Sequence, residues 1–166
     1  MATHSSAEPS QAGGRSRLGL RLLATGAGVG YLPVAPGTAG SLLGAALCLP
    51  MLSLPQPVYF GVTIVLTAVA VWAAGGMAVE LGEADPAPVV IDEVVGMLWA
   101  ALALPPRLFD VAAVFLLFRL FDIVKPTPIP WLERLPGGLG IVADDVAAGL
   151  LARLTWWLLK VNFDFL

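Results

Sequence analysis

Charged residues are scarce in this sequence. They make up 13% of its 166 residues, against about 25% in typical soluble domains, and none occurs between Arg21 and Glu80. Hydrophobic residues make up 58% of the chain. A soluble domain of this size could not bury so much apolar surface, so the composition predicts an integral membrane protein.

Cysteine and histidine are nearly absent, which excludes several kinds of site. Cys48 is the only cysteine and lies in an apolar run, so the chain can form neither an internal disulfide nor a thiolate metal site. No arginine follows it five residues later, which excludes a cysteine phosphatase. The only histidine, His4, lies in a polar N-terminal stretch, so histidine-based chemistry is not expected.

The apolar residues form five segments after a polar start. Residues 1–17 are rich in Ser, Ala, Gly and Gln and are predicted to be a disordered tail, which leaves 18–166 as one membrane-embedded helical domain. The segments are roughly Gly40–Leu52, Val58–Val79, Val89–Leu104, Leu108–Val124 and Ile141–Lys160. The second is long enough to cross a membrane, whereas the first and third fall short of the ~20 residues needed. We therefore expect an all-α membrane bundle of about four to five helical segments.

If the segments alternate in direction, the polar stretches between them meet on one side of the membrane. That side holds the glycine-rich entry to the first segment and the loops at residues 80–88 and 125–140. Six of the nine Lys and Arg residues also lie there, namely Arg15, Arg17, Arg21, Arg119, Lys125 and Arg134. Arg107 and Lys160 lie on the other side. The positive-inside rule predicts that this shared face is cytoplasmic.

One apolar segment carries charges at helical spacing. Arg119 and Asp122 are three residues apart and share a helix face, Lys125 continues that face, and Pro126 is expected to end the helix. An intrahelical ion pair is one explanation. The other is a phosphate site, because a guanidinium fork and an ammonium group both suit phosphate oxygens.

Two pairs of adjacent acids lie near the starts of other segments, at Asp92-Glu93 and Asp144-Asp145. Acids in a first helical turn complement the helix dipole, worth about 0.3–1 kcal/mol each. Placing an acidic side chain in hydrocarbon at a helix centre raises the insertion free energy by about 2.5–3.5 kcal/mol, so the helix dipole offsets only a small part of it. We interpret these four carboxylates, with Asp122, as ligands for a hard cation, and Mg²⁺ is the expected cofactor.

Small residues follow two of these acids after one helical turn. Gly96 is four residues after Asp92, and Gly149 is four residues after Asp145. Each glycine therefore shares a face with an acid, which predicts close contact between helices around the site.

The stretch at residues 24–41 is too rich in glycine and proline to form a helix before about Ala39. Its end offers free N–H groups and two hydroxyls at a helix start, which suits a phosphate; the relevant residues are Gly37, Thr38 and Ser41. A simple helix cap explains the same residues. Together, the carboxylates, a divalent ion and the basic residues describe metal-assisted phosphoryl chemistry.

Four motifs, in order, resemble the phosphatidylglycerophosphatase A family of bacterial membrane lipid phosphatases. They are Ala-Pro-Gly-Thr-Ala-Gly-Ser at the end of 24–41, Val-Ile-Asp-Glu-Val-Val-Gly-Met at 90–97, Phe-Arg-Leu-Phe-Asp-Ile-Val-Lys-Pro-Thr-Pro-Ile at 118–129 and Gly-Gly-Leu-Gly-Ile-Val-Ala-Asp-Asp-Val-Ala-Ala-Gly at 137–149. The resemblance covers roughly residues 22–150. One departure is the loop at 82–86, where some members carry a histidine and this chain does not, so Asp85 is only a weak candidate for a site residue there.

The resemblance implies Mg²⁺-dependent hydrolysis of phosphatidylglycerophosphate to phosphatidylglycerol and inorganic phosphate, at the cytoplasmic face of the bacterial inner membrane. The predicted catalytic and metal-binding residues are Asp92, Glu93, Asp122, Asp144 and Asp145. The predicted phosphate-binding residues are Arg119, Lys125, Thr38, Ser41 and Gly37. The expected partners are the phospholipid and the membrane, not nucleic acid. Whether water or a carboxylate attacks phosphorus stays open, as do the number of metal ions and the oligomeric state.

Two other classes of protein compete with the phosphatase. A small cation transporter or channel would use the carboxylates as ion-binding positions along a path, but here they gather at one end, and Lys125 is left without a role. A non-catalytic membrane subunit would use its acidic ends to bind a soluble partner and would tolerate single Asp→Asn changes. Metal-dependent phosphate release separates the enzyme from both.

Overall fold

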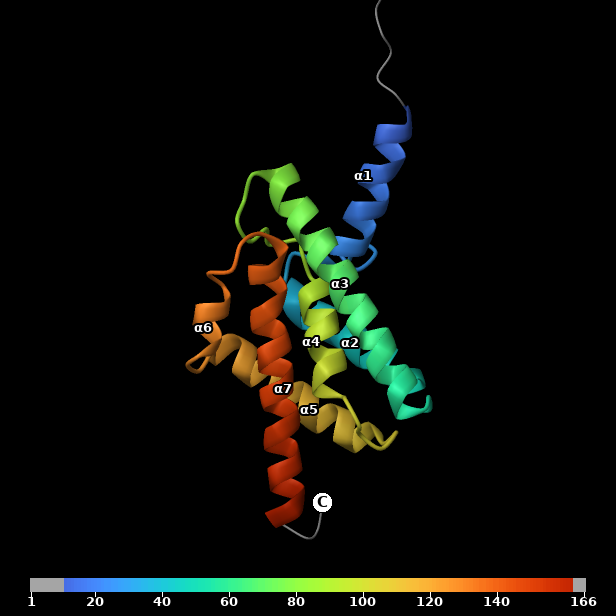
Figure 1. Ribbon diagram of the computed structural model, residues 1–166, viewed down its shortest axis with the longest axis vertical. Coiled ribbons are helices and arrows are strands. Elements are labelled where there is room, and N and C mark those ends of the chain that lie inside the picture. Colours follow the sequence, from blue (N-terminus) through green and yellow to red (C-terminus); the bar gives the residue numbers. More distant parts are fainter. Residues whose placement is uncertain (1–10, 163–166) are drawn as a thin grey trace, which may run out of the picture.

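The computed structural model describes residues 11–162, and the regular secondary structure in this part of the chain is all helical (Figure 1). The elements are α1 Gln11–Ala24, the 3₁₀ helix η1 Val29–Tyr31, α2 Pro36–Met51, α3 Gln56–Leu81, α4 Ile91–Ala100, α5 Leu108–Val124, α6 Ile129–Leu132 and α7 Gly138–Asn162. The predicted all-α class is confirmed.

The short helix α4 lies at the centre of the fold. It packs against α2, α3, α5 and α7, and Figure 1 shows it between α3 and α7. Its sequence is apolar on nearly every side, as expected of a helix enclosed by others. Its ten residues span about 15 Å, half of the ~30 Å hydrocarbon thickness, so α4 cannot cross a bilayer.

Only α3, among the described helices, is long and apolar enough to be a candidate membrane span. About a third of its most apolar window is buried in the protein, and the remaining residues are partly or fully exposed. The predicted membrane bundle of about four to five helical segments is therefore confirmed as all-helical, but only one of its described segments qualifies as a membrane span. The helices α2, α4 and α5 are too short to qualify as membrane spans, with 16, 10 and 17 residues. The long helix α7 instead carries four charged side chains, Asp144, Asp145, Arg153 and Lys160.

Most of the segment bounds agree with those expected from the sequence, but the first segment begins earlier. α5 has the predicted ends, and α3 and α7 extend two or three residues beyond theirs. α2 begins at Pro36, not near Ala39, which corrects the expectation for the glycine-rich stretch. Proline is favourable at the first helical position because its fixed φ suits the helix and its missing N–H is not needed there.

The first helix also differs from expectation. α1 begins at Gln11, inside the stretch predicted to be a disordered tail, whereas residues 1–10, with His4, lie outside the described residues. Two contacts fix its C-terminal half against the body. Leu20 packs on the apolar cluster that includes part of α3, and Arg21 forms an ion pair with Glu80 at 2.6 Å. A helix anchored in this way extends toward its N-terminus at little cost, because propagation is easier than nucleation.

At the far end of the bundle a buried acid joins α5 to α7. The Asp110 carboxylate is almost fully buried, accepts a hydrogen bond from the Trp156 indole N–H at 2.9 Å and pairs with the Lys160 ammonium. The ammonium balances the negative charge of the carboxylate, and the indole N–H donates a hydrogen bond to it, so this buried charge is compensated. Asp110 therefore has a structural explanation that does not involve a ligand.

The backbones of α4 and α7 touch at two glycines. A Cβ built on Gly149 would lie 2.2 Å from the Gly96 carbonyl oxygen, and one built on Gly96 would lie 2.9 Å from the Asp145 carbonyl oxygen. No side chain fits in either place without moving a helix. The predicted close approach of helices beside the acids is therefore confirmed, and it brings Asp92 and Asp145 to the same space.

We expect Gly149→Ala to separate α4 from α7, because the new methyl group overlaps backbone that cannot rotate away. The free energy of unfolding should fall by about 1–3 kcal/mol, the usual cost of overpacking, in denaturant titrations of detergent-solubilised protein. Gly61→Ala on α3 is the matched control, because its Cβ would meet no atom within 4 Å. Equal stability of the two variants would contradict the close contact.

Candidate active site

Residues from all the polar motifs of the chain line one cavity of about 590 Å³. Its walls come from the starts of α2, α4 and α7, the ends of α3 and α5, and the loops that follow α3 and α5. All five predicted carboxylates line it, namely Asp92, Glu93, Asp122, Asp144 and Asp145. The expectation that the polar stretches meet at one place is met, although the elements that form the cavity are not all membrane spans.

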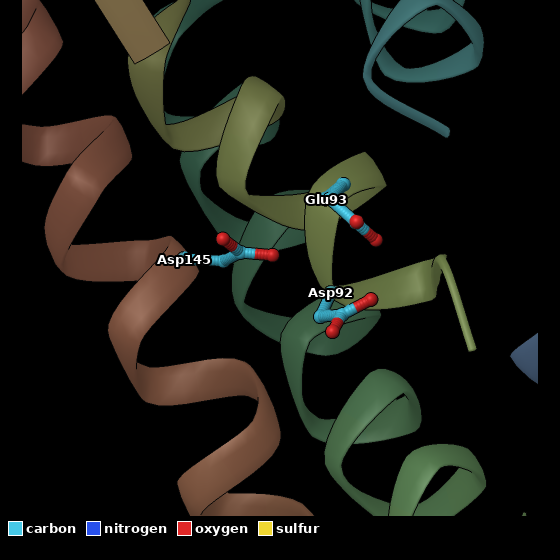
Figure 2. A group of neighbouring side chains, drawn as sticks. All are labelled: Asp92, Glu93 and Asp145. Atoms are coloured by element: carbon cyan, nitrogen blue, oxygen red, sulfur yellow. The ribbon is translucent and has the colours of Figure 1, made fainter. Parts of the chain in front are cut away.

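Asp92, Glu93 and Asp145 form a compact acidic cluster. Each offers one carboxylate oxygen, and these three oxygens lie within 4.8 Å of one another. Figure 2 shows Asp92 and Glu93 projecting from the first turn of α4, and Asp145 reaching toward them from α7. The contact between Gly96 and Gly149 explains this proximity, because each glycine lies one turn beyond an acid on the same helix face.

The cluster contains buried oxygens that lack a hydrogen-bond partner. Within the described part of the chain, Asp92 Oδ1, Glu93 Oε2 and Asp145 Oδ1 are all buried and unpaired. An unpaired buried carboxylate oxygen is costly, so a folded protein normally supplies it with a donor or a cation. Three adjacent carboxylates, each with an unpaired buried oxygen, offer the oxygen ligands that hard divalent cations bind.

Burial also changes the protonation of the cluster, which lies outside α3. Burial raises the pKa of Asp92, Glu93 and Asp145 above the ordinary carboxyl values, because it removes water from the charged forms. The Glu93 charge raises the pKa of Asp92 further, and the Asp92 charge does the same for Asp145. Without a counter-ion, the protein therefore disfavours the fully charged cluster.

Asp144 forms an ion pair with a basic side chain, and among the described residues its neighbour Asp145 does not. The Lys125 ammonium donates to Asp144 Oδ2 at 2.7 Å and also to Glu133 Oε1, so it bridges two carboxylates. Burial alone lowers the pKa of Lys125, but the hydrogen bonds that its ammonium donates to the two carboxylates outweigh this effect, and the net pKa is raised. Lys125 is therefore held as a cation at the cavity wall.

The position of Lys125 depends on how α5 ends. The helix stops at Val124, and Lys125 caps it in the left-handed region, with φ at 45° and its N–H bonded to the Phe121 carbonyl. The following Pro126 prevents continuation, as the sequence predicted. This turn directs the lysine toward α7 rather than along the surface of α5.

Arg119 lies behind the cavity wall. Its Nη1 donates to Asp122 Oδ2 at 2.6 Å and to Ser41 Oγ at 3.2 Å, while Ser41 Oγ donates to the Gly37 carbonyl at 2.8 Å. The ion pair predicted from the spacing of Arg119 and Asp122 is confirmed. Of the five predicted phosphate-binding residues, only Gly37 and Lys125 line the cavity, and the structure does not bring Arg119, Thr38 or Ser41 to its wall.

The start of α2 lies directly against Glu93. A Cβ built on Gly37 would fall 2.2 Å from Glu93 Oε1 and 3.5 Å from Arg119 Nη1, so a larger residue would displace this carboxylate from its present position. The first N–H groups of a helix have no partner within the helix, and those of α2 begin at this wall. The glycine-rich motif thus contributes backbone and space more than side-chain chemistry.

Three further acids line the cavity that the sequence did not assign: Glu83, Asp85 and Glu133. The first two lie in the loop after α3, and Glu133 directly follows α6. No motif or helical spacing links them to the other acids, so only their location in the two polar loops could have pointed to them. With the five predicted acids, eight carboxylates line the cavity, and among its described lining residues only Lys125 carries a basic side chain.

The comparisons with known proteins agree on one family. The family model of phosphatidylglycerophosphatase A matches residues 22–160. The chain is 38% identical over 133 residues to phosphatidylglycerophosphatase A of Escherichia coli K12, covering 79% of this chain and 77% of that protein. It is 37% identical over 153 residues to phosphatidylglycerophosphatase A of Haemophilus influenzae, covering 84% of this chain and 91% of that protein.

A third relative carries a different name. It is the "Putative phosphatidylinositol-3-phosphatase" of Bacteroides thetaiotaomicron, 40% identical over 137 residues, which cover 78% of this chain and 86% of that protein. No solved structure shows a significant match to the chain.

The repulsion within the acidic cluster predicts a stabilising substitution. In chelator, Asp145→Asn should raise the free energy of unfolding by about 0.5–2 kcal/mol, the usual range for a stabilising change, because it removes one of three crowded buried charges. Thermal unfolding of the purified protein measures this.

Asp110→Asn is the matched control for Asp145→Asn, because it makes the same change at a buried acid whose charge is compensated. It should lower the free energy of unfolding, by about 3 kcal/mol, since it leaves Lys160 without its counter-charge. Destabilisation by both substitutions would show that the cluster is not under repulsion.

Proposed function

The chain belongs to the phosphatidylglycerophosphatase A family and is a phosphatase, and we propose that it hydrolyses phosphatidylglycerophosphate to phosphatidylglycerol and inorganic phosphate with the help of Mg²⁺. The membership excludes the cation transporter and the non-catalytic subunit as descriptions of the protein. The lipid substrate is carried over from the names of the Escherichia coli and Haemophilus influenzae relatives.

The charge balance of the cavity is the observation that supports a metal-dependent reaction. Eight carboxylates and one ammonium line it, so a phosphate dianion entering alone would be strongly repelled. Divalent cations remove that repulsion. The acidic wall and the anionic substrate are compatible only if cations lie between them.

Asp92, Glu93 and Asp145 are the residues that would hold Mg²⁺. One oxygen of each carboxylate lies within 4.8 Å of the others, each carboxylate has an unpaired buried oxygen, and an all-oxygen ligand set suits a hard cation. When bound there, Mg²⁺ supplies charge to the phosphoryl oxygens and lowers the pKa of a coordinated water. The number of ions is not part of the proposal.

The remaining residues bind and orient the reacting groups. Lys125 donates to a phosphate oxygen, and the free N–H group of Gly37 at the start of α2 offers a further donor. Asp122, fixed by its ion pair with Arg119, presents a carboxylate to the cavity that can accept a proton. Hydrolysis breaks the bond between phosphorus and the lipid oxygen, and the lipid leaves as an alcohol. Attack by water and attack by a carboxylate give the same products.

The position of the cavity supports action at a membrane surface. Gly75, Ala78 and Val79, from the last two turns of α3, line it, so the cavity lies at one end of the candidate span. The phosphate groups of a phospholipid layer lie at the ends of membrane-crossing helices. We assign this end to the cytoplasmic face of the inner membrane, on the distribution of basic residues in the sequence.

Phosphatidylinositol 3-phosphate is a second candidate substrate, favoured by the name of the Bacteroides thetaiotaomicron relative. Both lipids present a phosphomonoester on a polar headgroup. The groups described above act on the phosphate and not on the rest of the headgroup, so side-by-side assays of both lipids decide between them.

Purified protein in detergent should release phosphate from phosphatidylglycerophosphate in Mg²⁺ and not in chelator. Asp92→Asn should lower kcat by about a hundredfold or more, because metal charge stabilisation is worth several kcal/mol and each 1.36 kcal/mol is a factor of ten. Glu80→Gln, outside the cavity, should keep the wild-type rate. A folded wild-type protein that releases no phosphate from either lipid would overturn the proposal.

Metal binding should also be visible without turnover. Mg²⁺ at about one hundred times its dissociation constant should stabilise the wild-type protein by about 2.7 kcal/mol, which raises its melting temperature by several degrees. Asp145→Asn should lose most of this rise. An equal rise in both proteins would place the cation elsewhere.

A further inference from the structure

Lys125 binds two carboxylates that differ in their surroundings. Its Nζ lies 2.7 Å from Asp144 Oδ2, and the Asp144 side chain is 8% exposed. Its other partner, Glu133, has a side chain that is 46% exposed. One partner is therefore buried in the protein, while the other is nearly half in solvent.

The two acids also differ in how firmly the backbone holds them. Asp144 lies inside α7, a helix of 25 residues. Glu133 directly follows α6, which has only four residues, and it belongs to the loop between α5 and α7. A side chain on a short exposed element gives up its contact more easily than one in a long packed helix. Of the two bonds to Lys125, the one from Glu133 is the displaceable one.

The exposed carboxylate occupies the place that a phosphate would take. Lys125 is the only basic side chain among the described residues that line the cavity, and Glu133 lines it as well. An ammonium has three N–H donors, and two of them are used by the two carboxylates. A phosphate that binds Lys125 with more than one oxygen must therefore replace one of these two carboxylates.

We propose that Glu133 is a placeholder for the substrate phosphate on Lys125: its carboxylate holds the ammonium in the empty site and is displaced when a phosphomonoester binds. This inference rests on the proposed function, since it requires a phosphate at Lys125. Glu133 acts through Lys125 and is a positioning residue that weakens the binding of phosphate ligands.

The competition suits a site that works among phospholipids. A phosphomonoester carries about −1.5 to −2 charges at neutral pH, more than a carboxylate, and so displaces Glu133. A phosphodiester lipid, including the reaction product, carries one charge and gains nothing over the carboxylate already present. While Glu133 is bound to the Lys125 ammonium, the abundant diester lipids and the reaction product compete poorly for it.

The test is Glu133→Gln, which keeps the shape and removes the charge. The KM for phosphatidylglycerophosphate and the inhibition constants of inorganic phosphate and phosphatidylglycerol should all fall by about two- to fivefold, the range over which an exposed ion pair shifts an equilibrium. The kcat should not change. Glu133→Asp, which restores the charge, should return these constants toward the wild-type values.

Glu80→Gln is the matched control. It makes the same substitution in another partly exposed ion pair, with Arg21 at 2.6 Å, but Glu80 does not line the cavity. Its KM and inhibition constants should equal those of the wild type. Calorimetric titration of both variants with inorganic phosphate, in detergent with Mg²⁺, measures binding independently of turnover, and thermal unfolding confirms that each variant is folded.

The outcomes separate the two proposals. An active wild-type protein whose Glu133→Gln variant binds phosphate no more tightly, or has a lower kcat with a higher KM, overturns the placeholder and leaves the phosphatase intact. A folded wild-type protein that releases no phosphate overturns the proposed function and the placeholder with it. Tighter phosphate binding in Glu133→Gln alone, with kcat unchanged, supports the placeholder.

Discussion

The contact between the backbones of α4 and α7 is the constraint on which the site depends. Gly96 and Gly149 let the two helices meet without intervening side chains. One helical turn away, the same approach forces Asp92 and Asp145 together and buries them. A short central helix in contact with four others then supports the charged cluster, and the three acids of the cluster lie on helices rather than on loops.

Around this cluster the protein separates two kinds of charge. Among the described residues no basic side chain forms an ion pair with Asp92, Glu93 or Asp145, whereas Asp122 is paired with Arg119 and Asp110 with Lys160. The difference distinguishes carboxylates that the fold compensates from those it leaves for a ligand. It also explains why a buried acid outside the cavity is not by itself a sign of function.

The sequence predicted what depends on spacing along one helix and missed what depends on contacts between loops. The ends of α5 and the ion pair of Arg119 with Asp122 followed from helical periodicity and Pro126. The two acidic pairs were found because charge is rare in apolar segments. Glu133 could not be found in this way, because its partner lies eight residues away across an irregular turn. Composition likewise predicted more membrane spans than the lengths of the helices allow, since an enclosed helix such as α4 is as apolar as a spanning one.

Lys125 ends α5 with a positive φ, where glycine and asparagine are the usual residues. For an amino acid with a side chain this conformation costs roughly 1–2 kcal/mol, so a change to glycine would relax the backbone. It would also remove the only ammonium on the described cavity wall. A glycine would also leave Asp144 and Glu133 without their shared cation. The end of α5 therefore combines a strained backbone with a charge that the cavity needs, and the two cannot be optimised separately at this position.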